Sequence, residues 1–181
     1  DQDGDMDILC SQFDMSASMS EIAWWENDGN EVWTKHVVSS RFQQSPFVYG
    51  ADMDNDGDID LIGTGELNGE ICLWTNDGQE NWTEQVIDNQ FSKAHTVLAR
   101  DFDKDGDLDI LAHASTSSLQ AWYENIGSGN FNKKPMENLG GAIYMDCEDF
   151  DLDGDYDLIA TGMTATSLVC YENDGFQRLT R

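Results

Sequence analysis

Residues 101–112 read DFDKDGDLDILA, and this stretch decides the fold. Five aspartates alternate with other residues around Gly106, and an apolar run of three residues follows directly. The pattern recurs at residues 52–63 and 149–160, and residues 1–10 carry most of it. The four loop glycines are 53, 49 and 48 residues apart: Gly4, Gly57, Gly106 and Gly154. A repeat of this length is typical of propeller blades or of a solenoid.

The rest of each unit repeats as well. After each aspartate ladder comes a short apolar run, which predicts a buried strand. An aromatic strand follows and ends in a turn such as Trp24-Trp25-Glu26-Asn27-Asp28-Gly29, and Asp-Gly between strands is a strong hairpin signal. A further strand carries an aromatic residue at matching places, namely Trp33, Trp82, Phe131 and Phe176. An apolar strand such as residues 96–99 then enters the next ladder.

These patterns predict an all-β chain of four-stranded antiparallel meanders. Adjacent aromatic residues such as Trp24 and Trp25 point to opposite faces of a strand, so both are buried only if the sheet is covered on both sides. Propeller blades cover each other in this way. We therefore expect one β-propeller segment over residues 1–181, with about four blades in the approximate repeats 1–48, 49–97, 98–145 and 146–181. Because the first repeat lacks a first strand, we expect the segment to belong to a larger propeller or assembly, or to associate with itself.

The ladder aspartates predict a metal site in each loop. Carboxylates this dense repel one another unless a cation lies among them. Oxygen ligands on a short loop suit a hard cation, and calcium accepts six to eight of them. We expect about three to four Ca²⁺ per chain, with the candidate residues Asp1, Asp3, Asp5, Asp7, Asp52, Asp54, Asp56, Asp58, Asp60, Asp101, Asp103, Asp105, Asp107, Asp109, Asp149, Asp151, Asp153, Asp155 and Asp157.

Other interpretations of the ladder fit less well. An EF-hand loop needs a glutamate at position twelve, where this chain has Gly63, Ala112 or Ala160. A disordered acidic tract does not account for a spacing that recurs between apolar strands. The histidines His36, His95 and His113 occupy non-equivalent places and are expected to lie on the surface or in packing contacts.

Composition limits the partners. The 181 residues carry a net charge of −27, and about half of the 36 acidic residues lie in the ladders. No basic stripe is present to neutralise phosphates, so we expect neither nucleic acid nor an anionic membrane surface as a partner. No apolar stretch approaches the ~18 residues of a membrane span. The four cysteines, at unrelated spacings, are Cys10, Cys72, Cys147 and Cys170. They are expected to be buried free thiols or to form one disulfide, and the sequence does not decide between the two.

The spacing Asp-x-Asp-x-Asp-Gly-Asp-x-Asp, followed by an apolar strand and an Asn-Asp-Gly turn, resembles the FG-GAP/VCBS repeat of extracellular propellers, to which the integrin alpha head is related. The resemblance covers essentially the whole chain. It implies that loop positions one, three, five and nine supply carboxylates to calcium and that position seven supplies a backbone carbonyl. The seventh side chain is then expected to point outwards. The chain departs from the integrin branch because no Phe-Gly-Gly-Ala-Pro motif precedes the loops.

The resemblance implies a secreted or cell-surface, calcium-stabilised propeller segment that serves adhesion, assembly or ligand binding. Its protein or glycan ligand is not defined by the sequence. The alternatives are a lectin-like carbohydrate-binding module and the propeller part of a polysaccharide-degrading enzyme. We expect no catalysis, because the repeats look interchangeable and a catalytic site needs unlike groups in one cleft.

Overall fold

The computed structural model describes residues 3–12, 20–44, 47–115, 119–136, 142–162, 168–173, 175 and 179–180. Every regular element in this part of the chain is a β-strand, which confirms the predicted all-β class. The described residues contain no helix long and apolar enough to cross a membrane. The chain forms two compact units, residues 1–94 and 95–181, and each unit is described separately.

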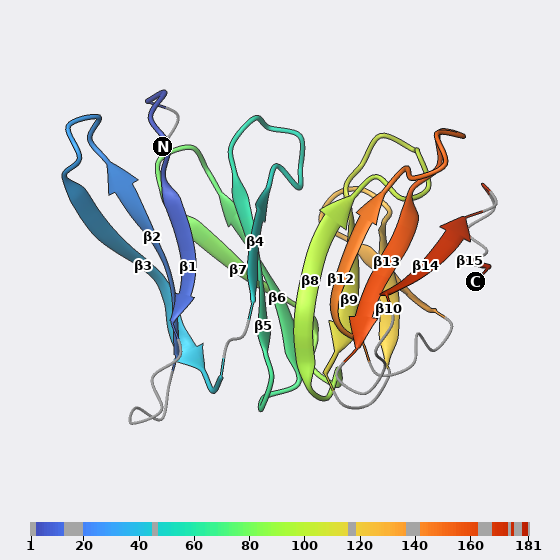
Figure 1. Ribbon diagram of the computed structural model, residues 1–181. Helices are drawn as coiled ribbons and strands as arrows, with labels where there is room; N and C mark the ends of the chain where they lie inside the picture. The colour runs from blue at the N-terminus through green and yellow to red at the C-terminus, as the bar shows by residue number, and fades with distance from the viewer. Residues whose placement is uncertain are drawn as a thin grey trace. The chain divides into compact units, whose positions relative to one another are not determined.

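The first unit contains two antiparallel sheets, here called blade 1 and blade 2 (Figure 1). Blade 1 has three strands in the order β1-β2-β3, and blade 2 has four in the order β4-β5-β6-β7. Each strand pairs with its neighbour in the sequence, as a meander requires. The strands are β1 (Ile8–Gln12), β2 (Ser20–Asn27), β3 (Trp33–Phe42), β4 (Val48–Ala51), β5 (Asp60–Gly65), β6 (Glu70–Asn76) and β7 (Trp82–Asp88).

The second unit repeats the arrangement as blades 3 and 4. Blade 3 runs β8-β9-β10-β11 and blade 4 runs β12-β13-β14-β15. The strands are β8 (Ala94–Arg100), β9 (Asp109–Ala114), β10 (Gln120–Asn125), β11 (Phe131–Pro135), β12 (Ala142–Glu148), β13 (Asp157–Gly162), β14 (Leu168–Asn173) and β15 (Leu179–Thr180). The four-stranded propeller-blade meander is thus confirmed, while Phe176, the predicted aromatic of the last strand, lies outside the described residues. The bounds of the four repeats and their union in one propeller segment stay predictions.

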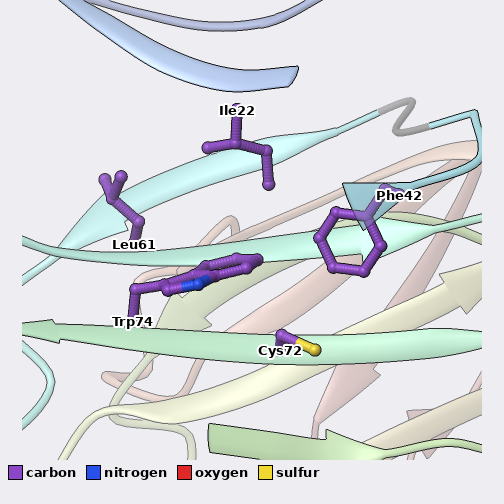
Figure 2. Close-up of a cluster of buried hydrophobic side chains, with 5 residues drawn as sticks. All are labelled: Ile22, Phe42, Leu61, Cys72 and Trp74. Atoms are coloured by element: carbon purple, nitrogen blue, oxygen red, sulfur yellow. The ribbon is translucent and has the colours of Figure 1, made fainter. Parts of the chain in front are cut away.

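Blades 1 and 2 pack face to face through an apolar cluster. Ile22 and Phe42 of blade 1 meet Leu61, Cys72 and Trp74 of blade 2, and all five side chains are at most 3% exposed (Figure 2). Gly63 lies in the same contact, because a Cβ there would stand 2.5 Å from Ile22 Cδ1. The alternation of β5 therefore sends Leu61 and Gly63 toward blade 1.

An arginine ties neighbouring blades together in each unit. Arg41, at the end of β3, donates from Nε to Glu84 Oε1 at 2.9 Å and from Nη1 to Glu70 Oε2 at 2.6 Å. Arg100, at the end of β8, donates from Nε to the carbonyl oxygen of Cys147 at 3.1 Å. These charge-assisted bonds hold blade 1 to blade 2 in the first unit and blade 3 to blade 4 in the second.

All four cysteines are free, so the structure holds no disulfide among them. Cys72 and Cys147 are fully buried, and burial raises the pKa of each thiol to about 12. Of the two alternatives, a buried free thiol or a disulfide, Cys72 and Cys147 are therefore buried free thiols. Cys10 is half-buried and Cys170 is exposed.

His113 departs from the repeat, because the matching residues of β1, β5 and β13 are Ser11, Thr64 and Thr161. Its side chain is fully buried, and neither ring nitrogen has a hydrogen-bond partner among the described residues. Burial, and secondarily the charge of His95, lower the pKa of His113 to about 4. The imidazole is therefore held neutral in the folded chain.

His113 should make the second unit sensitive to acid. The unfolded histidine titrates near 6.5 and takes up a proton first, so the free energy of unfolding should fall as pH decreases from about 6.5 to 4. The loss should reach about 3 kcal/mol. His113→Thr, which restores the residue of the other repeats, should flatten this slope in urea titrations at several pH values. Equal slopes in the two proteins would contradict the assignment.

Candidate metal centre

Each complete ladder is the loop between the first two strands of a blade. Residues 52–60 join β4 to β5, residues 101–109 join β8 to β9, and residues 149–157 join β12 to β13. The sixth position of each loop is a glycine with a φ of 98°, 101° or 99° (Gly57, Gly106 and Gly154). Only glycine adopts this backbone conformation readily, and it bends the loop around its own carboxylates.

The loop backbone turns the aspartates inward by a repeated set of hydrogen bonds. In the third ladder, Gly106 N–H donates to Asp101 Oδ2 at 3.1 Å, and Asp107 N–H donates to Asp105 Oδ1 at 2.9 Å. The second and fourth ladders repeat both bonds within 0.1 Å. The three loops therefore share one conformation.

This conformation gathers three carboxylates in each complete loop. One oxygen from each lies within 4.8 Å of the others in the groups Asp52, Asp54 and Asp60; Asp101, Asp103 and Asp105; and Asp149, Asp151 and Asp157. Asp56, Asp109 and Asp153 belong to the same loops but are not in these tight groups. Every member comes from position one, three, five or nine, the set that the resemblance assigned to calcium.

The ninth aspartate has a structural role besides. Asp109 is fully buried, and its Oδ2 accepts from Phe102 N–H at 3.1 Å while its Oδ1 accepts from Asn125 N–H at 2.7 Å. It therefore fastens the start of the loop to the end of β10. Asp60 and Asp157 make the same two bonds, and Asp7 makes the second of them to Asn27.

The carboxylates are electrostatically crowded. Burial raises the pKa of Asp60 and of Asp109 to about 6, against the opposing effect of their backbone hydrogen bonds. Burial and the neighbouring charge of Asp56 raise the pKa of Asp54, and burial and Asp105 do the same for Asp103. A divalent cation among these groups would reverse the effect by favouring the charged forms.

In two loops, one aspartate oxygen has no hydrogen-bond partner in the part of the chain that the structure describes. Oδ1 of Asp101 and Oδ1 of Asp149 are buried and accept no hydrogen bond from the described residues. Burying a carboxylate oxygen without a partner is costly unless a cation lies beside it. These first-position aspartates thus fit a hard metal ion bound by oxygen.

The seventh aspartate is in none of the tight groups and lies beside a turn instead. Asp58 Oδ2 lies 2.4 Å from where a Cβ on Gly78 would stand, and Asp5 and Asp155 lie equally close to Gly29 and Gly175. These glycines belong to the Asn-Asp-Gly turns, so the seventh side chain packs against the neighbouring hairpin. Asp107 is farther from its turn, at 3.9 Å from the Gly127 position.

The first ladder is described only in part. Asp1 lies outside the described residues, while Asp3, Asp5 and Asp7 follow the pattern of the other loops. Asp5 N–H donates to Asp3 Oδ1 at 2.8 Å, and Gly4 has a φ of 100°.

Position four of the ladder also has a left-handed backbone, with φ between 62° and 63° at Asn55, Lys104 and Leu152. Asparagine tolerates this conformation, whereas leucine is strained by about 1 kcal/mol or more. Leu152→Asn should therefore raise the free energy of unfolding by about 0.5–1 kcal/mol in urea titrations. Leu152→Ala is the control, because it removes the same exposed apolar side chain without relieving the backbone. An equal gain in both variants would contradict the strain.

A pocket of about 500 Å³ lies between blades 1 and 2. Trp24 and Trp82 line it together with Glu80 and Asn76, and Trp24 Nε1 is buried with no hydrogen-bond partner among the described residues. Trp24 stacks on His36 at 4.3 Å between ring centroids, and His36 Nδ1 lies 3.6 Å from Glu80 Oε2. Sequence reasoning treated the tryptophans as packing residues and missed this pocket, because Trp24 and Trp82 hold different repeat positions in different blades.

Comparison with known proteins supports the fold. The family model of the FG-GAP-like repeat matches residues 1–63 and 52–112. No curated protein matches the sequence. Among solved structures, a lectin of Agrocybe aegerita, described for its specific recognition of non-reducing terminal N-acetylglucosamine, superposes with a TM-score of 0.64 at 18% identity. The match covers 97% of this chain and 51% of the lectin, so the chain spans about half the lectin's length.

Proposed function

The chain belongs to the FG-GAP-like repeat family, and on that premise we propose that it is a calcium-stabilised, non-catalytic propeller module of an extracellular protein. Its blades present a surface for adhesion, assembly or ligand binding, and calcium stabilises the loops between their first two strands. The ion has a structural role in this proposal, because it neutralises each ladder and fixes the turn.

The observation that carries the proposal is the buried, unpartnered Oδ1 of Asp101 and Asp149 within loops that gather two further carboxylates each. An oxygen-only donor set on a short loop favours Ca²⁺ over zinc, which prefers nitrogen and sulfur. Extracellular calcium modules bind with dissociation constants of about 10⁻⁴–10⁻³ M, and loops this exposed fit that range. The exposure of the loops and the family support the extracellular placement in this proposal.

Calorimetric titration of the metal-free chain tests the proposal. We expect calcium to bind at three to four sites, and magnesium to bind more weakly because it requires a stricter octahedral geometry. Asp101→Ala should remove one site. Asp107→Ala is the matched control, since the seventh position contributes only its backbone carbonyl, and it should keep that site. Loss of a site in both variants, or in neither, would refute the ligand assignment.

A second candidate function is carbohydrate binding, favoured by the pocket between blades 1 and 2. An aromatic platform with a few polar groups beside it is the general form of a small-ligand site. Trp24 and Trp82 offer the platform, and Glu80 and Asn76 offer hydrogen-bonding groups. The superposable lectin supports the candidate at the level of the fold alone.

A glycan array that includes N-acetylglucosamine-terminated glycans tests this second candidate. A hit is expected to be weak per site and to depend on Glu80→Ala. The control is Glu31→Ala, because Glu31 holds the same turn position in blade 1, with a φ of 63° against 61° at Glu80, and does not line the pocket. Equal binding by the two variants would place the sugar elsewhere.

A further inference from the structure

Position four of the three complete ladders is occupied by unlike residues, namely Asn55, Lys104 and Leu152, and only Lys104 carries a charge. By sequence, Lys104 belongs to the third ladder, in blade 3. Its ammonium group nevertheless reaches the fourth ladder, in blade 4, where Nζ forms an ion pair with Asp155 Oδ1. Both loops lie in the second unit of the chain.

Two further observations place the Lys104 ammonium group at the fourth ladder. Its Nζ lies 3.5 Å from where a Cβ on Gly154, the sixth-position glycine of that loop, would stand. The hydrogen bond to Asp155, followed by the charges of Asp155, Asp153 and Asp149, raises the pKa of Lys104. All three aspartates belong to the fourth ladder, and Asp149 is a member of its tight group of carboxylates. The lysine of one loop is thus a cation of the next loop.

A positive charge beside a set of carboxylates opposes the binding of another cation to the same set. The repulsion follows Coulomb's law and is largest at low ionic strength, because salt screens exposed charges. The side chain of Lys104 is 46% exposed, so this screening applies to it. In the metal-free loop the same ammonium group reduces the mutual repulsion of the aspartates around it.

We infer that Lys104 competes with calcium for the fourth ladder and lowers the calcium affinity of that loop. The inference rests on the proposed function, since it concerns one of the calcium loops, and it adds a residue that is not itself a ligand. The fourth ladder therefore fills at a higher calcium concentration than its own carboxylates would set. Blade 4 in turn depends on calcium less than a loop without such a lysine would make it.

Nuclear magnetic resonance can follow each loop separately, because each sixth-position glycine has its own amide signal. Gly154 N–H donates to Asp149 Oδ2 at 3.0 Å, and Gly106 N–H donates to Asp101 Oδ2 at 3.1 Å. Each signal thus reports on the first-position aspartate of its own loop. Titration of the metal-free full chain with calcium, in about 10 mM NaCl, gives the half-saturating concentration of each loop.

Lys104→Gln removes the charge and should lower the half-saturating calcium concentration at Gly154 about three- to tenfold. The change should shrink in about 0.5 M NaCl, because salt screens the repulsion. The Gly106 signal should shift its half-saturation less, since the ammonium group lies at the fourth ladder and not at its own.

Two control variants isolate the position of the charge. Lys104→Arg keeps a cation at the same place, so its calcium titration should match that of the unchanged chain. Lys133→Gln removes one positive charge from β11, where Lys133 Nζ lies 5.6 Å from the ring centroid of Tyr123. It should leave the Gly154 titration unchanged.

The outcomes separate this inference from the proposed function. If calcium bound to the loops but Lys104→Gln left the half-saturation at Gly154 unchanged, the inference would be wrong and the calcium module would stand. An equal gain in Lys133→Gln would assign the effect to net charge, and an equal gain in Lys104→Arg would assign it to the shape of the side chain; either result would overturn the inference. If calcium shifted none of the glycine signals, the proposed function would fail together with it.

Discussion

Removal of calcium with EDTA is expected to lower the melting temperature by about 10 °C or more. Each loop with a dissociation constant ten- to a hundredfold below the calcium concentration contributes about 1.4–2.7 kcal/mol, and three complete loops are present. For a chain of this size, each kcal/mol corresponds to about 2–4 °C. Calorimetry or circular dichroism in calcium, in EDTA, and in EDTA with excess calcium measures the shift.

Magnesium in place of calcium is the control for this shift, and it should restore only part of it because the loop oxygens do not form a rigid octahedral site. If sodium chloride alone restored the melting temperature, the calcium effect would be explained by screening of carboxylate repulsion. An unchanged melting curve in EDTA would contradict structural calcium.

The second large effect separates two aspartates of one loop. Asp109→Ala should lower the free energy of unfolding by about 3–5 kcal/mol, because the N–H groups of Phe102 and Asn125 lose their acceptor inside the protein. The loss should persist in EDTA. Asp103→Ala should destabilise the chain in calcium but not in EDTA, since Asp103 is half-exposed and crowded by Asp105.

Urea titrations of both variants, with and without calcium, give this comparison. Asp109→Asn is a milder control, since it retains a carbonyl oxygen for one of the two N–H groups. If Asp109→Ala were harmful only in calcium, its role would be ligation alone. If Asp103→Ala were equally harmful in EDTA, its carboxylate would stabilise the loop without a metal.

Much of the fold could be predicted because each strand and turn pattern occurs several times in the sequence. The apolar runs at residues 8–10, 61–63, 110–112 and 158–160 fall in β1, β5, β9 and β13, and Asp-Gly follows β2 and β6 as a hairpin turn requires. The glycine at the sixth ladder position, which marked the repeat in the sequence, has a positive φ in every loop. Four copies of one pattern average out the ambiguity of any single short strand.

The candidate site could be predicted only in part. Spacing places the aspartates in one loop, but it does not say that the ninth one has both oxygens bonded to backbone N–H groups. That role depends on where β10 or its counterpart ends in space, as at Asn125. The pocket at Trp24 and Trp82 escaped prediction for the same reason, because it forms between two blades. His113 could be seen as unusual in the sequence, but not as buried.

The most direct test of the account is a crystal of the chain grown in millimolar calcium, with anomalous difference density measured for calcium. The account predicts one peak in each of the loops 52–60, 101–109 and 149–157, within about 2.3–2.6 Å of the first-position aspartate oxygens. A fourth peak is expected at the first ladder. Loops without anomalous density at millimolar calcium, or peaks that prove to be zinc, would contradict it.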